Sequence, residues 1–282
     1  MANCTSKSLS LALILTGTLF QTLPSMSGSA WGQDLSLETG DNIAYIGNTT
    51  ADRMQHHAWL ETYLHALHPD HQLTFRNLGF SGDEVKTRPR SANFGTPDQW
   101  LTKVGADTVF CFFGYNEALR GDTGLQQFKT DLAGMLDGMA AQKYNGESAP
   151  KVVVFSPIAH ENLNSRHLPD GSSNNANLEL YTNAMRDVCT EKAVPFVDLF
   201  ELSQELYATA DLPLTMNGVH LLDHGNRALA RAVLPKLIPG SQAPADSPLI
   251  PFLKRWKAKN LNRSCWSKVK FAARKIVNTT AR

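Results

Sequence analysis

Residues 108–113 read TVFCFF, an apolar run that indicates the fold class. A strand without polar positions is buried on both faces, as in a parallel sheet covered by helices. Other short β-rich runs lie at 43–46, 72–77, 151–155 and 195–199. Segments with helical spacing of apolar residues lie between or after them, at 51–67, 125–139, 178–189 and 223–237. This alternation predicts an α/β domain in which helices cover a parallel sheet of about five strands.

Four short segments stand where functional groups of such a sheet are expected, just beyond the carboxyl ends of the strands. GNT at 47–49 follows the first strand, NLGFSG at 77–82 the second and GYNE at 114–117 the third. NGVH at 217–220 precedes the last helix. Each segment alone is also ordinary turn chemistry, and only their combination and order indicate a functional site.

Taken in this order, the four segments resemble the sequence blocks of the SGNH (GDSL-type) hydrolase family, over residues 42–237. The family blocks are G-D-S, N-x-G-x-x-G, G-x-N-[DE] and D-x-x-H. The chain is also similar to SGNH-type proteins common in planctomycete-like bacteria, in which G-N-T replaces G-D-S. The resemblance implies a three-layer α/β/α sandwich with a flavodoxin-like parallel sheet. It also implies hydrolysis of esters without a metal or an organic cofactor.

The resemblance assigns a role to each matching residue. Thr49 stands at the position of the nucleophile, His220 at that of the general base, and Asn217 at that of the residue that orients the base. The backbone N–H groups of Thr49 and Gly82 and the side-chain amide of Asn116 would form the oxyanion hole. Such donors suit acyl transfer because the tetrahedral intermediate develops negative charge on one oxygen.

Two departures from the family pattern leave two functions open. Thr49 replaces a serine, and its extra methyl restricts the side chain and crowds an approaching carbonyl. Asn217 replaces an aspartate, and in serine proteases the same exchange slows the reaction about 10⁴-fold through the wrong histidine tautomer. One reading is an esterase that removes short acyl groups, such as acetyl, from carbohydrate. The other is a catalytically impaired domain that binds a glycan or cell-envelope component, with 47–49 serving only as a turn and helix cap.

Further residues are candidates for substrate contact. His160 follows the strand at 151–155 and is placed to line the cleft, although a loop histidine without a role would look the same. Arg53 and Glu84 lie near the first two blocks, and Glu84 would equally pair with an arginine.

Three other patterns suggest different functional residues, but each has an argument against it. Ser81 is a rival nucleophile, but Asp83 occupies the second glycine position of a G-x-S-x-G elbow. Asp223 is a rival partner for the base, or else a cap of the last helix. His65 and His68 have a spacing that suits a shared metal, but no H-E-x-x-H is present, so we predict a solvated helix face and no metal.

The ends of the chain predict processing and a separate tail. Lys7, the apolar stretch 9–19 and small residues at 27–30 indicate a signal peptide over 1–30, so we expect a periplasmic or extracellular protein. The hydrolase-like domain is expected over 40–238 and a linker over 239–251. Cys111 and Cys189 lie in apolar contexts and are predicted to be buried thiols.

The charge is unevenly distributed. Residues 247–282 hold ten of the 27 Lys and Arg and none of the 26 Asp and Glu, so an acidic body precedes a basic tail. The tail at 252–282 has the pattern of a basic amphipathic helix, which would touch an anionic membrane surface or an anionic polysaccharide. A solvated extension is the alternative. An acidic body in an exported chain argues against binding to nucleic acid.

Overall fold

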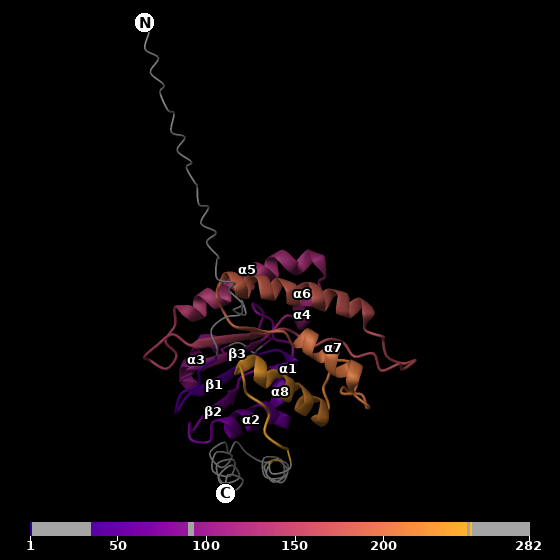
Figure 1. The fold of residues 1–282 in the computed structure, drawn as a ribbon, viewed down its shortest axis with the longest axis horizontal. Helices are drawn as coiled ribbons and strands as arrows, with labels where there is room; N and C mark the ends of the chain where they lie inside the picture. Colours follow the sequence, from indigo (N-terminus) through magenta and orange to yellow (C-terminus); the bar gives the residue numbers. More distant parts are fainter. Residues whose placement is uncertain (2–34, 90–92, 247–248, 250–282) are drawn as a thin grey trace. The chain divides into compact units, whose positions relative to one another are not determined.

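A computed structural model describes residue 1 and residues 35–89, 93–246 and 249 (Figure 1). The predicted signal peptide at 1–30 and the basic tail at 252–282 fall outside the described residues, apart from Met1, and the predicted linker falls partly outside.

The sheet has five strands, all parallel, as predicted. The strands are β1 (Asn42–Gly47), β2 (Thr74–Asn77), β3 (Thr108–Phe112), β4 (Lys151–Phe155) and β5 (Phe196–Val197). Their order is β2-β1-β3-β4-β5, which is the flavodoxin-like arrangement. The central strand β3 is buried along its whole length, as its apolar sequence requires.

Helices cover both faces of this sheet (Figure 1). They are α1 (Thr49–His57), α2 (Trp59–Leu67), α3 (Pro97–Val104), α4 (Tyr115–Ala118), α5 (Asp122–Ala140), α6 (Ser172–Glu191), α7 (Leu199–Thr209) and α8 (Asp223–Leu237). One hydrophobic core lies between the sheet and α1, α2, α7 and α8, and a second lies between the sheet and α3, α5 and α6. Within the described residues, no helix is both long and apolar enough to span a bilayer.

The predicted helix at 51–67 is two helices. Ala58 takes a left-handed conformation (φ 54°) between α1 and α2, and its N–H donates to the carbonyl of Met54 to end the first helix. This break turns α2 so that it packs beside α8. Left-handed backbone is usually marked by Gly or Asn, so an alanine there gave no warning in the sequence.

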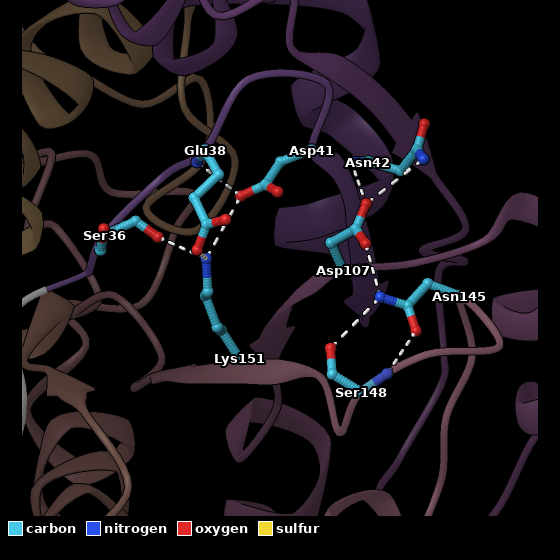
Figure 2. Close-up of polar contacts among 8 residues, drawn as sticks. All are labelled: Ser36, Glu38, Asp41, Asn42, Asp107, Asn145, Ser148 and Lys151. Carbon is cyan, nitrogen blue, oxygen red and sulfur yellow. Dashed lines mark hydrogen bonds and ion pairs between the residues drawn. The ribbon is translucent and has the colours of Figure 1, made fainter.

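Polar side chains fasten the amino ends of the strands (Figure 2). Asp107, just before β3, accepts hydrogen bonds from the backbone N–H of Asn42 (2.7 Å) and from the side chain of Asn145 (2.8 Å). Lys151, at the start of β4, donates to the carbonyl of Ser36 and pairs with Glu38 at 3.0 Å. Structural contacts therefore occupy the amino edge of the sheet, and the predicted functional segments lie at its carboxyl edge.

Candidate active site

The first segment is shaped by close contact between β1 and β3. Gly47 has φ 134°, and a Cβ there would lie 2.0 Å from the carbonyl oxygen of Phe112, so only glycine fits. Asn48 then caps α1, because its side-chain oxygen accepts from the N–H of Thr50 at 3.1 Å. Thr49 is thus the first residue of the helix and not its cap. Its hydroxyl has no hydrogen bond within the described residues and is left for another role.

Three of the four predicted segments meet at one cavity of about 220 Å³. Thr49 comes from the first, Asn116 from the third and His220 from the fourth, and Arg53 joins them from the second turn of α1. The other lining residues are Asn48, Thr50, Tyr115, Ile158, Val219, Leu221 and Asn226. A hydroxyl, an imidazole and an amide donor therefore share one hollow at the carboxyl edge of the sheet.

The second segment is fastened to the first turn of α1 and does not itself line this cavity. The carboxylate of Asp52 accepts from both the N–H (3.2 Å) and the hydroxyl (2.6 Å) of Ser81. Asn77 donates to the carbonyl of Ala51 at 2.6 Å. Gly82, which follows Ser81, has φ 90°, which favours glycine. These bonds fix the loop that carries the Gly82 N–H against the helix that carries Thr49.

The second and third segments are joined by two side chains. Asn116 donates one amide hydrogen to the carbonyl of Asp83 at 3.1 Å, which fixes which end of its amide is the donor. The buried carboxylate of Glu117 accepts from the N–H groups of Val85 (2.8 Å) and Gly114 (3.0 Å). These hydrogen bonds thus link the two loops that are expected to hold the oxyanion. Burial raises the pKa of Glu117, and these backbone donors oppose that effect.

The orientation of His220 follows from its contact with Asn217. The side-chain oxygen of Asn217 accepts from the backbone N–H of His220 at 3.1 Å and lies 2.9 Å from its Nδ1. A backbone N–H only donates, so the atom that it meets is the amide oxygen and not the nitrogen. Nδ1 must then carry the proton, which leaves Nε2 with its lone pair. An asparagine could have favoured the tautomer with its proton on Nε2, but this geometry favours the tautomer with its proton on Nδ1.

The electrostatic setting keeps His220 neutral. Burial lowers the pKa of His220 below its ordinary value, and the positive charge of Arg53 lowers it further. A neutral imidazole with a free Nε2 is the form that a general base needs. What this site lacks is the negative charge that an aspartate would place behind the ring.

His160 lies behind the histidine loop. It is not among the residues that line the cavity; its ring contacts Gly218, where a Cβ would lie 2.3 Å from Nε2. Its neighbour Glu161 is buried and accepts from the N–H of Thr215 (2.7 Å), its hydroxyl (2.6 Å) and the N–H of Leu214 (2.9 Å). Both residues support the loop that carries His220.

The remaining candidates are engaged elsewhere. Glu84 pairs with Arg120 at 2.7 Å, Ser81 with Asp52, and Asp223 with His57 at 3.1 Å. His65 is buried with its ring 5.1 Å from that of Phe75, so the predicted solvated face is wrong for this residue.

No cluster of three or more metal-ligating side chains occurs in the part of the chain that the structure describes. Cys111 and Cys189 are buried free thiols, as predicted, and burial raises the pKa of Cys189 to about 12.

Sequence reasoning missed Glu117 and Glu161 as supports of the site. Glu117 was visible as the last residue of GYNE, and Glu161 follows the histidine in 158–161 (IAHE). A buried carboxylate that collects backbone N–H groups leaves no sequence signature of its own, because its partners are amides that every residue carries.

Comparison with known proteins agrees with this architecture. The sequence model of the GDSL-like lipase/acylhydrolase family matches residues 30–228. No curated protein matches the chain by sequence.

Solved structures show the fold. An acetylxylan esterase from Geobacillus stearothermophilus, as a catalytic mutant, superposes with a TM-score of 0.58 at 18% identity, over 75% of this chain and 100% of that one. An α/β hydrolase from the metagenome of Lake Arreo gives 0.51 at 19% identity, over 71% and 96%.

A gut microbial diltiazem-metabolizing enzyme, BT4096, gives a TM-score of 0.58 at 16% identity over 74% of this chain. The chain spans about half the length of that enzyme, 49%. The family match covers well over half of the present chain, and the sheet order and the convergence of Thr49, Asn116 and His220 agree with it. The chain belongs to the GDSL-like lipase/acylhydrolase family and is a carboxylic ester hydrolase of the SGNH type.

Proposed function

We propose that this hydrolase removes short acyl groups, such as acetyl, from carbohydrate, with Thr49 as its nucleophile. The observation that carries the proposal is that Thr49, Asn116 and His220 line a single cavity, with Nε2 of His220 left as the proton acceptor. The Thr49 hydroxyl has no competing hydrogen bond in the described part of the chain.

The first half of the reaction forms an acyl-enzyme. Thr49 Oγ1 attacks the carbonyl carbon of the ester while Nε2 of His220 takes the hydroxyl proton. The negative charge that appears on the carbonyl oxygen is met by the N–H of Thr49 and the amide of Asn116, which line the cavity, and we expect the N–H of Gly82, on the adjoining loop, to be the third donor. The N–H of Thr49 is available because the first N–H groups of a helix have no partner within the helix. The imidazolium then gives its proton to the departing sugar oxygen, and the carbon–oxygen bond breaks.

The second half releases the acid. Water attacks the acyl carbon while His220 takes one of its protons. The bond between the acyl carbon and Oγ1 of Thr49 then breaks, the free acid leaves, and His220 returns the proton to Oγ1. Asn217 holds the ring through Nδ1 in both halves, although as a neutral amide it stabilises the imidazolium less than a carboxylate would. We therefore expect slow turnover compared with a Ser-His-Asp enzyme.

The size of the cavity and the structural neighbours support a small acyl group on a sugar. A volume of about 220 Å³ lies below the usual range for drug-sized ligands, roughly 300–1,000 Å³. The acetylxylan esterase with the same fold acts on acetylated polysaccharide, as its name states. An exported protein, as the amino-terminal sequence predicts, would meet such polymers outside the cell.

The test is hydrolysis of p-nitrophenyl acetate and acetylated xylo-oligosaccharides by the wild-type chain and three variants. Thr49→Val keeps the shape without the hydroxyl and should abolish turnover, whereas Thr49→Ser should keep or raise it. Ser81→Ala, at the rival hydroxyl, should still form the acyl-enzyme on Thr49, but more slowly, because one of the two bonds that hold the Gly82 loop on Asp52 is lost. Mass spectrometry of the protein after a fluorophosphonate reagent should place the label on Thr49. Full activity in Thr49→Val, or a label elsewhere, would remove Thr49 as the nucleophile.

The rival function is supported by a specific observation: His220 has a cation near it and no carboxylate behind it, which weakens it as a base. A domain that only binds a glycan would bind acetylated oligosaccharides but release no acetate under any condition. In that case Thr49→Val would bind them as well as the wild type does.

A further inference from the structure

The cavity has an unbalanced charge. Of its eleven lining residues, Arg53 alone carries a full charge at neutral pH, and none is an acid. The other polar groups are neutral hydroxyls, amides and the imidazole of His220. The cavity also lies at the amino end of α1, where unpaired N–H groups add partial positive charge.

Two carboxylates adjacent in sequence to cavity residues form hydrogen bonds with other groups. Asp52, directly before Arg53, accepts two hydrogen bonds from Ser81. Glu117, directly after Asn116, holds two backbone N–H groups. Neither therefore balances the charge of Arg53.

Arg53 itself has no partner in the described part of the chain. Its Nε is buried without a hydrogen bond, and no ion pair or hydrogen bond engages its guanidinium. Arg53 is half-exposed, but its buried Nε–H lacks an acceptor, which costs free energy that a ligand oxygen would recover. A guanidinium fits the two oxygens of a carboxylate particularly well.

We propose that the substrate of this site carries a carboxylate group, which Arg53 binds inside the cavity. The proposal builds on the esterase function above and narrows its substrate class to acidic esters. The carboxylate has two chemical sources, namely an acidic sugar that bears the acyl group or a dicarboxylic acyl group such as succinyl.

The bound anion would also complete the catalytic charge. His220 becomes an imidazolium in the transition state, beside Arg53 and with only the neutral Asn217 behind it. A carboxylate on Arg53 cancels the positive charge that opposes this imidazolium. The substrate would then supply part of the negative charge that an aspartate gives in a Ser-His-Asp triad.

Binding by isothermal titration calorimetry tests the proposal without turnover. Matched probes are methyl β-D-glucuronide against methyl β-D-glucoside for the sugar source, and monomethyl succinate against methyl butyrate for the acyl source. We expect one acidic probe to bind the full chain about 10- to 100-fold more tightly than its neutral match. Arg53→Gln should remove this difference, and Arg53→Lys should keep part of it.

Lys192→Gln is the matched control, because it removes one positive charge at the surface, where Lys192 pairs with Asp137. It should leave the preference unchanged. Equal binding of both acidic probes and their neutral matches, or a preference that survives Arg53→Gln, overturns the proposal. Hydrolysis of p-nitrophenyl acetate is measured alongside. Normal hydrolysis without acid binding refutes only the present proposal, whereas acid binding without any ester hydrolysis refutes only the esterase function.

Discussion

The side-chain oxygen of Asn217 accepts the backbone N–H of His220 while it lies 2.9 Å from Nδ1 of the same residue. One atom therefore fixes both the bend of the loop and the tautomer of the ring. This arrangement needs only an oxygen at that position, which both Asn and Asp provide. The difference between the two residues in this site is thus charge and not geometry.

Asn217→Asp should accordingly raise activity. A carboxylate oxygen accepts the same hydrogen bonds, and its charge stabilises the imidazolium formed during proton transfer. We expect kcat/KM for p-nitrophenyl acetate to rise by at least about tenfold, with the roughly 10⁴-fold effect in serine proteases as the ceiling. Asn217→Ala should lower it, because the ring loses its anchor. An unchanged kcat/KM in a folded Asn217→Asp protein would contradict the role given to this residue.

The pH dependence of activity should reflect the environment of His220. Burial and then the charge of Arg53 lower its pKa below the ordinary 6.5, and only the neutral ring accepts a proton. The fall of kcat/KM on the acid side should therefore have its midpoint below pH 6.5. Arg53→Gln should move this midpoint upward, because it removes the positive charge, and Asn217→Asp should move it still further upward, because it adds a negative charge. A midpoint above the ordinary value in the wild-type chain would show that the ring sits in a different electrostatic setting.

The sequence predicted those elements whose signal is local. The apolar run of β3 and the apolar spacing of α8 (Asp223–Leu237) gave a strand and a helix where the structure has them. Two helices that were not predicted, α3 and α7, begin at side-chain caps, Thr96 followed by Pro97, and Asp198. These caps were readable signals, whereas the left-handed Ala58 was not.

In the candidate site, too, local sequence motifs predicted some residues correctly, whereas contacts between distant segments could not be predicted. Asn116 and His220 were found through motifs, and the structure places both on one cavity with Thr49. His160 was expected in the cleft because it follows a strand. That position fixes where the backbone emerges but not which way the ring turns. The ring instead packs on Gly218, which belongs to a segment 58 positions later in the chain, and no local pattern carries such a contact.

This contact predicts an unusually costly Gly218→Ala. The new Cβ would lie 2.3 Å from Nε2 of His160, at φ 88°. Gly146 is a matched control because it has a similar φ of 84°, and a Cβ at that position would meet nothing within 4 Å. Gly146→Ala should cost only the backbone strain, about 1–2 kcal/mol, and Gly218→Ala about 2–4 kcal/mol in urea unfolding. In a His160→Ala background the excess should shrink. Equal costs at both glycines would show that the loop moves freely away from His160.

Glu61, on α2, is buried and lines a small cavity of about 20 Å³. Both of its carboxylate oxygens and the hydroxyl of Tyr45 are buried without a hydrogen-bond partner among the described residues. The cavity has room for one water, which would satisfy these groups. Burial raises the pKa of Glu61 from 4.5 to about 8, so the folded protein holds this proton at neutral pH and the unfolded chain does not.

A raised pKa in the folded state means that the stabilising contribution is present at low pH and is lost as pH rises. Between pH 4.5 and about 8, Glu61 should lower the free energy of unfolding by up to about 1.4 kcal/mol per pH unit. Glu61→Gln carries no titrating proton, so its stability should exceed that of the wild type by more at pH 8 than at pH 5. Urea unfolding from pH 5 to 9 measures this, with the exposed Glu179→Gln as control. Parallel stability curves for the wild type and Glu61→Gln would mean that Glu61 ionises as readily inside the fold as outside it.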